Sequence, residues 1–103
     1  MTKFIFHIPL YKYSNNNLIR LEIDDLIDDL INQLYESGVV SFYTQTVQSY
    51  YKRREFDTFL ITVFCDVNID EIFVSWFFEN NHILEQEALG YEKDNQLIIK
   101  ELE

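Results

Sequence analysis

Large apolar side chains alternate with other residues at the start of the chain. Between Lys3 and Tyr11, every second position is apolar, at Phe4, Phe6, Ile8 and Leu10. A repeat of two residues is that of a half-buried strand. Pro9 cannot donate a backbone hydrogen bond, so it must lie at an edge or a bend of this strand. After the turn-forming residues 15–17, residues 18–22 are expected to return as a short strand.

A helical repeat follows this region. Its apolar side chains recur three and four residues apart, at Ile23, Leu26, Ile27, Leu30, Ile31 and Leu34. This spacing places them in one stripe along a helix. Asp24 and Asp25 suit the first turn, where the helix dipole favours negative charge, and Gly38 provides a left-handed stop. The pattern therefore predicts a helix over residues 24–37.

The second half of the chain predicts two strands, a helix and a strand. Residues 39–51 are rich in Val, Thr, Phe and Tyr and predict a long strand, with a bulge because its alternation is imperfect. Residues 58–65 predict the next strand, and the two should form a hairpin. Asn68 should cap a second helix, whose stripe is Ile69, Ile72, Phe73, Trp76 and Phe77. Residues 80–90 are compatible with a continuing helix or a loop, and residues 96–102 predict the last strand.

This order of elements predicts one compact α+β domain over residues 1–103. The pattern is ferredoxin-like (β-α-β-β-α-β), with a four-stranded antiparallel sheet and two helices on one face. The other face of such a sheet is open to solvent. Five side chains are expected on this open face: Tyr43, Tyr51, Leu60, Phe64 and Ile98.

Composition supports a folded, cytoplasmic protein. Of the 103 residues, 48% are apolar and 17% aromatic, which argues against disorder despite a formal net charge of −10. The single cysteine, Cys65, cannot form an internal disulfide. No apolar run approaches the roughly 20 residues that span a bilayer, and the N-terminus does not resemble a signal peptide. We therefore expect no membrane association and a location in the cytoplasm, or in the host cytoplasm if a phage encodes the chain.

The acidic residues are not interspersed with basic ones. Residues 21–51 contain six carboxylates and residues 55–92 contain nine, and neither stretch has a Lys or Arg. Because a surface of one sign repels itself, such an arrangement predicts recognition of a basic protein partner and disfavours direct nucleic-acid or membrane binding. The predicted partner-binding residues are Asp24, Asp25, Asp28, Asp29 and Glu36, a second patch of Asp70, Glu71 and Glu79, and the aromatic Tyr43 and Tyr51.

Catalytic and metal-binding motifs are weak. The motif formed by Asp24, Asp25, Asp28 and Asp29 resembles the magnesium motif of isoprenoid synthases, but the chain is too short and too rich in strands for that class. His82 and Glu85 have helical spacing for two metal ligands without an evident third. Cys65 and His7 are interpreted as structural residues. We therefore predict no catalytic residue, no metal site and no cofactor, and hence no enzymatic activity.

The only basic cluster is Lys52-Arg53-Arg54, next to Tyr50 and Tyr51. Basic residues beside tyrosines are typical of RNA-binding hairpins. The net charge of the chain repels phosphate, so self-association or a salt bridge to an acidic helix is the favoured interpretation.

These features predict a small acidic inhibitor that mimics nucleic acid and occupies the basic groove of a nucleic-acid-binding protein or nuclease. Its size and charge resemble those of phage products that disarm host defence, anti-CRISPR proteins included, and this likeness is one of composition only. One alternative is an immunity protein or antitoxin that neutralises a basic toxin nuclease. Another is a structural or housekeeping subunit that forms a homodimer through its open sheet face.

Overall fold

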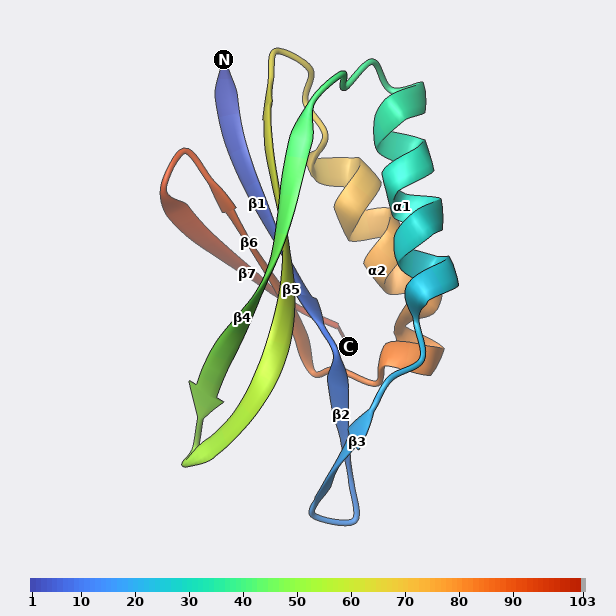
Figure 1. The fold of residues 1–103 in the computed structure, drawn as a ribbon, viewed down its shortest axis with the longest axis vertical. Helices are drawn as coiled ribbons and strands as arrows, with labels where there is room; N and C mark the ends of the chain where they lie inside the picture. The colour runs from blue at the N-terminus through green and yellow to red at the C-terminus, as the bar shows by residue number, and fades with distance from the viewer. Residues whose placement is uncertain (103) are drawn as a thin grey trace.

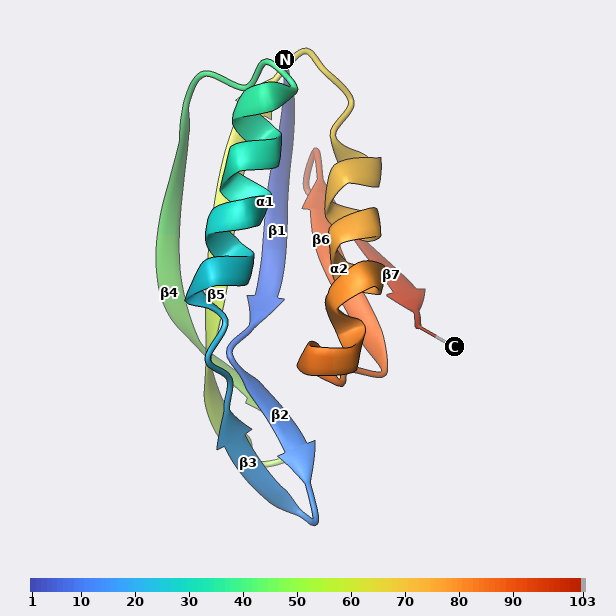
Figure 2. The same cartoon turned by 90° about the vertical axis from the view of Figure 1, so that its right-hand side faces the viewer.

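Two helices cover one face of a five-stranded antiparallel sheet (Figures 1 and 2). The computed structural model describes residues 1–102. In spatial order, the strands of the sheet are β4 (Phe42–Tyr51), β5 (Arg54–Cys65), β1 (Thr2–Pro9), β6 (Ala88–Lys93) and β7 (Gln96–Glu101). The helices are α1 (Asp24–Glu36) and α2 (Asp70–Leu84). A separate hairpin of β2 (Tyr11–Ser14) and β3 (Asn17–Arg20) extends beyond the end of β1.

The predicted α+β class, with two helices on an antiparallel sheet, is confirmed. The sheet has five strands instead of four, so the ferredoxin-like pattern is confirmed only in part. The strand that the sequence did not predict is β6, which begins within residues 80–90, the region compatible with either a helix or a loop. The first predicted strand divides after Pro9 into β1 and β2. The strand predicted at residues 18–22 is β3 (Asn17–Arg20), which pairs with β2 instead of the main sheet. Neither helix in the described part of the chain, residues 1–102, is long and apolar enough to cross a bilayer.

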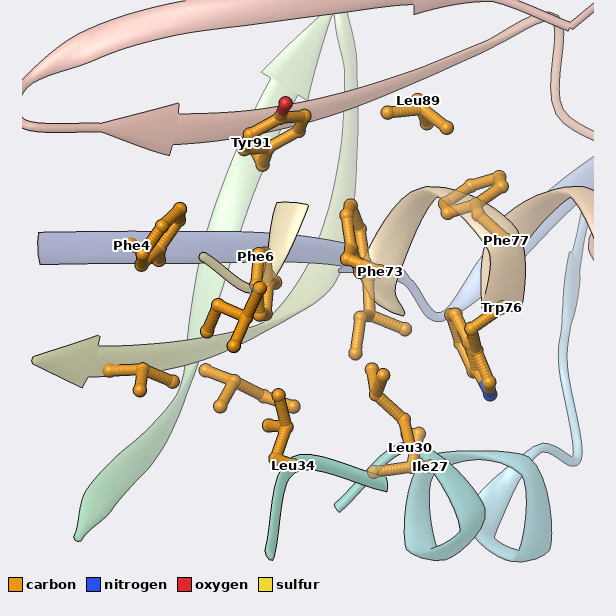
Figure 3. Packing of buried hydrophobic residues seen from close by; sticks show 14 of the residues in the cluster. Phe4, Phe6, Ile27, Leu30, Leu34, Phe73, Trp76, Phe77, Leu89 and Tyr91 are labelled. Carbon is orange, nitrogen blue, oxygen red and sulfur yellow. The ribbon is translucent and has the colours of Figure 1, made fainter. Parts of the chain in front are cut away.

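The core lies between the sheet and the two helices (Figure 3). The alternate residues Phe4, Phe6 and Ile8 of β1 are buried against the helices, as the period of two predicts. Phe6 stacks on Phe73 of α2, with ring centroids 4.5 Å apart and planes inclined by 10°. Trp76 is fully buried, and its Nε1 donates a hydrogen bond to the backbone oxygen of Leu26, which ties α2 to α1. The aromatic stripe of α2 is therefore the centre of the core.

Two sequence-based details of the sheet are wrong. β4 pairs residue for residue with β5, from Phe42 opposite Val63 to Tyr51 opposite Arg54, so the predicted bulge is absent from this pair. Ile98 lies opposite the buried Tyr91 and packs against the core, and its neighbours take the open face instead. A shift of one residue in register exchanges the two faces of a strand, and neighbouring strands decide that register.

The open face of the sheet carries the remaining four predicted side chains. Tyr43, Tyr51 and Phe64 are exposed, and Leu60 is half-buried. Leu97 and Ile99 of β7 lie on the same face, with exposed fractions of 60% and 64%. Both helices of the described residues lie on the other side of the sheet (Figure 1).

A buried tyrosine joins the sheet to the start of α2. The Tyr91 hydroxyl donates to Asp70 Oδ2 at 2.8 Å, and Lys93 Nζ lies 3.1 Å from Asp70 Oδ1. Burial, followed by the interaction with the Asp70 carboxylate, raises the pKa of Tyr91 to about 12. The hydroxyl of an unfolded tyrosine ionises at pH ~10, so the folded state favours the protonated hydroxyl of Tyr91.

We expect this preference to make stability depend on alkaline pH. The contribution of Tyr91 is complete below pH ~10 and is lost as the pH rises from there through about 12. Urea unfolding at several alkaline pH values should therefore show a fall in the free energy of unfolding that is smaller in Tyr91→Phe. The exposed Tyr43→Phe is the matched control and should behave as the wild type. An equal fall in wild type and Tyr91→Phe would contradict this assignment.

Candidate functional site

The tips of two hairpins lie at the same end of the molecule (Figure 2). β4 and β5 are joined by a two-residue turn in which Lys52 and Arg53 both have positive φ, at 50° and 63°. Asn15 and Asn16 form the equivalent turn between β2 and β3, with φ of 51° and 64°. Two-residue turns of this kind match the twist of the strands and keep the hairpins tight.

A stacked arginine connects the two hairpins. The Arg54 guanidinium lies over the ring of Tyr13, 4.0 Å from its centroid. Cations are attracted to the face of an aromatic ring, and Arg adds planar stacking. Within residues 1–102, no member of the Lys52-Arg53-Arg54 cluster forms an ion pair with an acidic side chain. Of the two favoured interpretations, a salt bridge to an acidic helix is therefore wrong within residues 1–102, and self-association stays a prediction.

The loop between α2 and β6 forms the third side of the site. Glu85 ends α2 in the left-handed conformation, with φ of 49°. The next residue, Gln86, is held by Asn81: the Asn81 amide donates to the Gln86 backbone oxygen at 3.1 Å and accepts from the Gln86 backbone N–H at 2.9 Å. The Gln86 side chain donates to the backbone oxygen of Tyr11 at 2.9 Å. Lys12 also forms an ion pair with Glu85, so two contacts tie this loop to β2.

These three segments enclose a pocket of about 480 Å³, which we call the hairpin pocket. Its volume is within the range of small-molecule sites, about 300–1,000 Å³. Its lining consists of Pro9, Tyr11, Lys12, Tyr13, Leu18, Tyr51, Lys52, Arg54, Phe56, Glu85, Gln86, Glu87 and Ala88.

A smaller pocket of about 280 Å³, the sheet pocket, continues onto the open face of the sheet. Both pockets share Pro9, Tyr51, Phe56, Gln86 and Ala88 in their linings. We therefore treat them as two halves of one cleft. The sheet pocket adds His7, Ser49, Thr58, Phe77, Leu89 and Gly90.

The cleft combines aromatic rings with charges of both signs. Aromatic faces suit a planar or a cationic group. In the hairpin pocket, Lys12, Lys52 and Arg54 lie with Glu85 and Glu87, which suits a ligand that has both an ammonium and a carboxylate. Among residues 1–102, no three His, Cys, Asp or Glu side chains are close enough together to hold a metal ion.

Most of the predicted partner-binding residues lie outside the cleft. Asp24, Asp25, Asp28, Asp29 and Glu36 are exposed on α1, and none of them lines either pocket. Their contact with a basic partner stays a prediction.

The second predicted patch is divided. Glu71 and Glu79 are exposed on α2, whereas the Asp70 carboxylate is bound by Tyr91 and Lys93.

The remaining two predicted partner-binding residues are tyrosines. Tyr51 lines both pockets, and Tyr43 lies on the open sheet face outside them.

Several residues considered for chemistry have structural partners. Cys65 is buried, and its Sγ lies 3.2 Å from the Val67 backbone oxygen. His82 is exposed on α2, and Glu85 pairs with Lys12. His7 is hydrogen bonded to Glu92, as expected for a satisfied strand histidine, yet it also faces the sheet pocket.

The sequence contained one signal for the cleft. The basic cluster at residues 52–54 beside Tyr51 stands out in an acidic chain, and it marks one wall of the hairpin pocket. The other walls, at residues 9–18 and 85–88, have no motif that relates them to this cluster. Their proximity depends on strand pairing.

Comparison with known proteins finds similarity in fold and none in sequence families. No known family model matches the chain, and no curated protein sequence is significantly similar to it. Two solved structures of a phage SAM lyase share the fold. The complex with S-methyl-5′-thioadenosine has a TM-score of 0.55 and 14% sequence identity, covering 97% of this chain and 88% of the lyase chain. The apo structure has the same TM-score and coverage, with 12% identity.

This finding corrects the functional predictions from the sequence. Both similar structures are of one enzyme, a phage SAM lyase. This finding contradicts the prediction that the chain has no enzymatic activity, and it contradicts the prediction that the chain mimics nucleic acid. The comparison also gives no support to an immunity protein, an antitoxin or a homodimeric structural subunit. Net charge reports on solubility and long-range attraction, and it does not report on fold or on chemistry at a site. For that reason the acidic composition was a poor guide to function here.

Proposed function

We propose that this chain binds S-adenosylmethionine in the cleft and cleaves it, releasing S-methyl-5′-thioadenosine. The observation that carries the proposal is the likeness to the phage SAM lyase, which extends over 97% of the chain. The four strands β4, β5, β1 and β6 with the two helices form the ferredoxin-like unit in this proposal, and β7 adds an edge strand. The reaction belongs in the cytoplasm, where S-adenosylmethionine is made.

The chemistry of the cleft supports this ligand. S-adenosylmethionine has a planar adenine, a positively charged sulfonium, and an amino-acid group with an ammonium and a carboxylate. Tyr51 and Phe56 offer rings at the junction of the two pockets, where adenine can stack or the sulfonium can lie over a ring face. Arg54 can bind the carboxylate, and Glu87 can bind the ammonium.

The proposed cleavage breaks the bond between the sulfonium sulfur and the γ-carbon of the methionine part. The bonding electron pair goes to sulfur, which becomes the neutral thioether of S-methyl-5′-thioadenosine. In the same step, a carboxylate oxygen of the methionine part forms a bond to the γ-carbon, so the four-carbon fragment leaves as a cyclic ester that keeps the ammonium group. No water, proton or oxidant is consumed. The positive charge on sulfur disappears along the reaction, so a cleft that excludes water from the sulfonium favours the transition state over the substrate.

Incubation of the purified chain with S-adenosylmethionine tests the proposal. Chromatography should show S-methyl-5′-thioadenosine appearing in proportion to the protein added. S-adenosylhomocysteine is the matched control. Cleavage of its neutral thioether would have to expel a thiolate, a much poorer leaving group than the thioether released from a sulfonium, so it should remain intact. If the chain releases no S-methyl-5′-thioadenosine from S-adenosylmethionine, the proposed cleavage is wrong, and if it also does not bind S-adenosylmethionine, the whole proposal is wrong.

A further inference from the structure

A diagonal line of polar side chains crosses the open face of the sheet. It contains one residue from each of four adjacent strands: Ser49 on β4, Thr58 on β5, His7 on β1 and Glu92 on β6. Ser49 pairs with Phe56, two residues before Thr58. Thr58 pairs with Pro9, two residues after His7, and His7 pairs with Gly90, two residues before Glu92. Diagonal neighbours of this kind are within reach of each other's side chains.

The four side chains of this line form two hydrogen-bonded pairs. His7 Nε2 lies 2.8 Å from Glu92 Oε2, and Ser49 Oγ lies 2.7 Å from Thr58 Oγ1. His7, Ser49 and Thr58 all line the sheet pocket. The polar groups are therefore placed at a cavity and not on a flat surface.

Small residues on β6 make room beside His7. Gly90 lies directly opposite His7 in the pairing of β1 with β6, and Ala88 is the next residue of β6 on the same face. Both line the sheet pocket. With a hydrogen atom and a methyl group at these positions, a ligand can approach the backbone of β6 and reach the imidazole.

The pairing with Glu92 determines what His7 can offer to a ligand. A carboxylate accepts hydrogen bonds, so the Nε2–H group of His7 donates a hydrogen bond to Glu92 in this pair. In the neutral ring, Nδ1 then has a free lone pair and is an acceptor. The Ser49 and Thr58 hydroxyls can each donate or accept. The site therefore provides an oriented acceptor beside two adaptable hydroxyls.

We propose that His7 recognises the ribose hydroxyls of the nucleoside, with Glu92 as its positioning residue. This inference rests on the proposed function, and it assigns the nucleoside to the sheet pocket and the amino-acid group to the hairpin pocket. A ribose diol is neutral and supplies the proton donor that Nδ1 requires. The negative charge of Glu92 disfavours the substrate carboxylate here, whereas Arg54, Lys12 and Lys52 attract it in the hairpin pocket.

Calorimetric titration with S-methyl-5′-thioadenosine and its 2′-deoxy and 3′-deoxy analogues tests this assignment. In the wild type, loss of the hydroxyl that His7 binds should weaken affinity about tenfold or more, because it leaves a desolvated acceptor unpaired. Equal affinity for all three nucleosides would overturn the assignment, and this comparison needs no variant to fold.

Variants of His7 and Glu92 then test which side chains produce the preference for the ribose hydroxyls. His7→Leu should reduce the ribose selectivity to about one, and His7→Asn, which keeps an acceptor near the position of Nδ1, should retain part of it. Glu92→Leu should lower the selectivity while leaving Nδ1 in place. Glu101→Gln is the matched control, because Glu101 lies on the same sheet face outside both pockets. Unchanged selectivity in His7→Leu would overturn the role of His7.

The two proposals fail in different ways. If the wild type binds neither S-adenosylmethionine nor S-methyl-5′-thioadenosine, the proposed function is wrong and the ribose assignment is wrong with it. If S-methyl-5′-thioadenosine binds and the deoxy analogues bind equally well, only the ribose assignment is wrong.

Discussion

Replacement of Arg54 by glutamine should lower kcat/KM for S-adenosylmethionine by about 10- to 100-fold. The change removes a charged donor that lines the hairpin pocket and would bind the substrate carboxylate. Hydrogen bonds to charged groups contribute about 1.5–3 kcal/mol, which corresponds to this range. Gln also loses the planar cation that stacks on Tyr13, so the two hairpins lose one of their contacts. Initial rates of S-methyl-5′-thioadenosine release measure the effect.

Arg53→Gln is the matched control for this experiment. It removes the same charge one residue earlier, from an exposed turn position that lines neither pocket. Its kcat/KM should stay within about twofold of the wild type, because a single exposed charge is strongly screened. Arg54→Lys should give an intermediate value, since it keeps the charge without the planar fork. Equal activities of Arg54→Gln and Arg53→Gln would place the substrate outside the hairpin pocket.

Replacement of Phe73 by alanine should reduce the free energy of unfolding by about 3–5 kcal/mol. Phe73 is fully buried and stacks on Phe6, and its ring also packs against those of Trp76, Phe77 and Tyr91. Alanine leaves a cavity where the helix layer meets the sheet, and the surrounding rings can fill it only in part. Small domains are stable by only about 5–15 kcal/mol, so this one change removes a large share. Urea unfolding followed by circular dichroism measures it.

Phe78→Ala provides the comparison within the same helix. Phe78 is 50% exposed, so its loss should change the free energy of unfolding by less than about 1 kcal/mol. Comparable losses in the two variants would contradict the position of Phe73 at the centre of the core.

Local patterns along the chain predicted the elements with strong periodicity. The stripe from Ile23 to Leu34 predicted a helix over residues 24–37, and α1 spans Asp24–Glu36. Such stripes are reliable because the residues that form them are neighbours in sequence and face a single layer. β6 was missed because its Ala and Gly have low strand propensity. Its identity as a strand depends on pairing with β1 and β7 on either side.

The candidate site was less predictable than the fold. Its walls come from residues 9–18, 51–56 and 85–88, which the pairing of β1 with β5 and β6 brings together. The carboxylates of α1 were predicted to bind a partner because they lie close together in the sequence, and none of them lines the cleft. The pair of His7 with Glu92 joins residues 85 positions apart, so no local motif could have shown it.

The sequence by itself determined the class of fold, the two helices, the aromatic core and the acidic surface. Each of these depends on composition or on a repeat of two to four residues, which nearby side chains define completely. The tertiary structure alone decided the fifth strand, the register that places His7 beside Gly90, and the cleft between the hairpins. These features arise from hydrogen bonding between strands that are distant in sequence. The stability of such pairing depends on both strands, so the sequence of one segment cannot predict it.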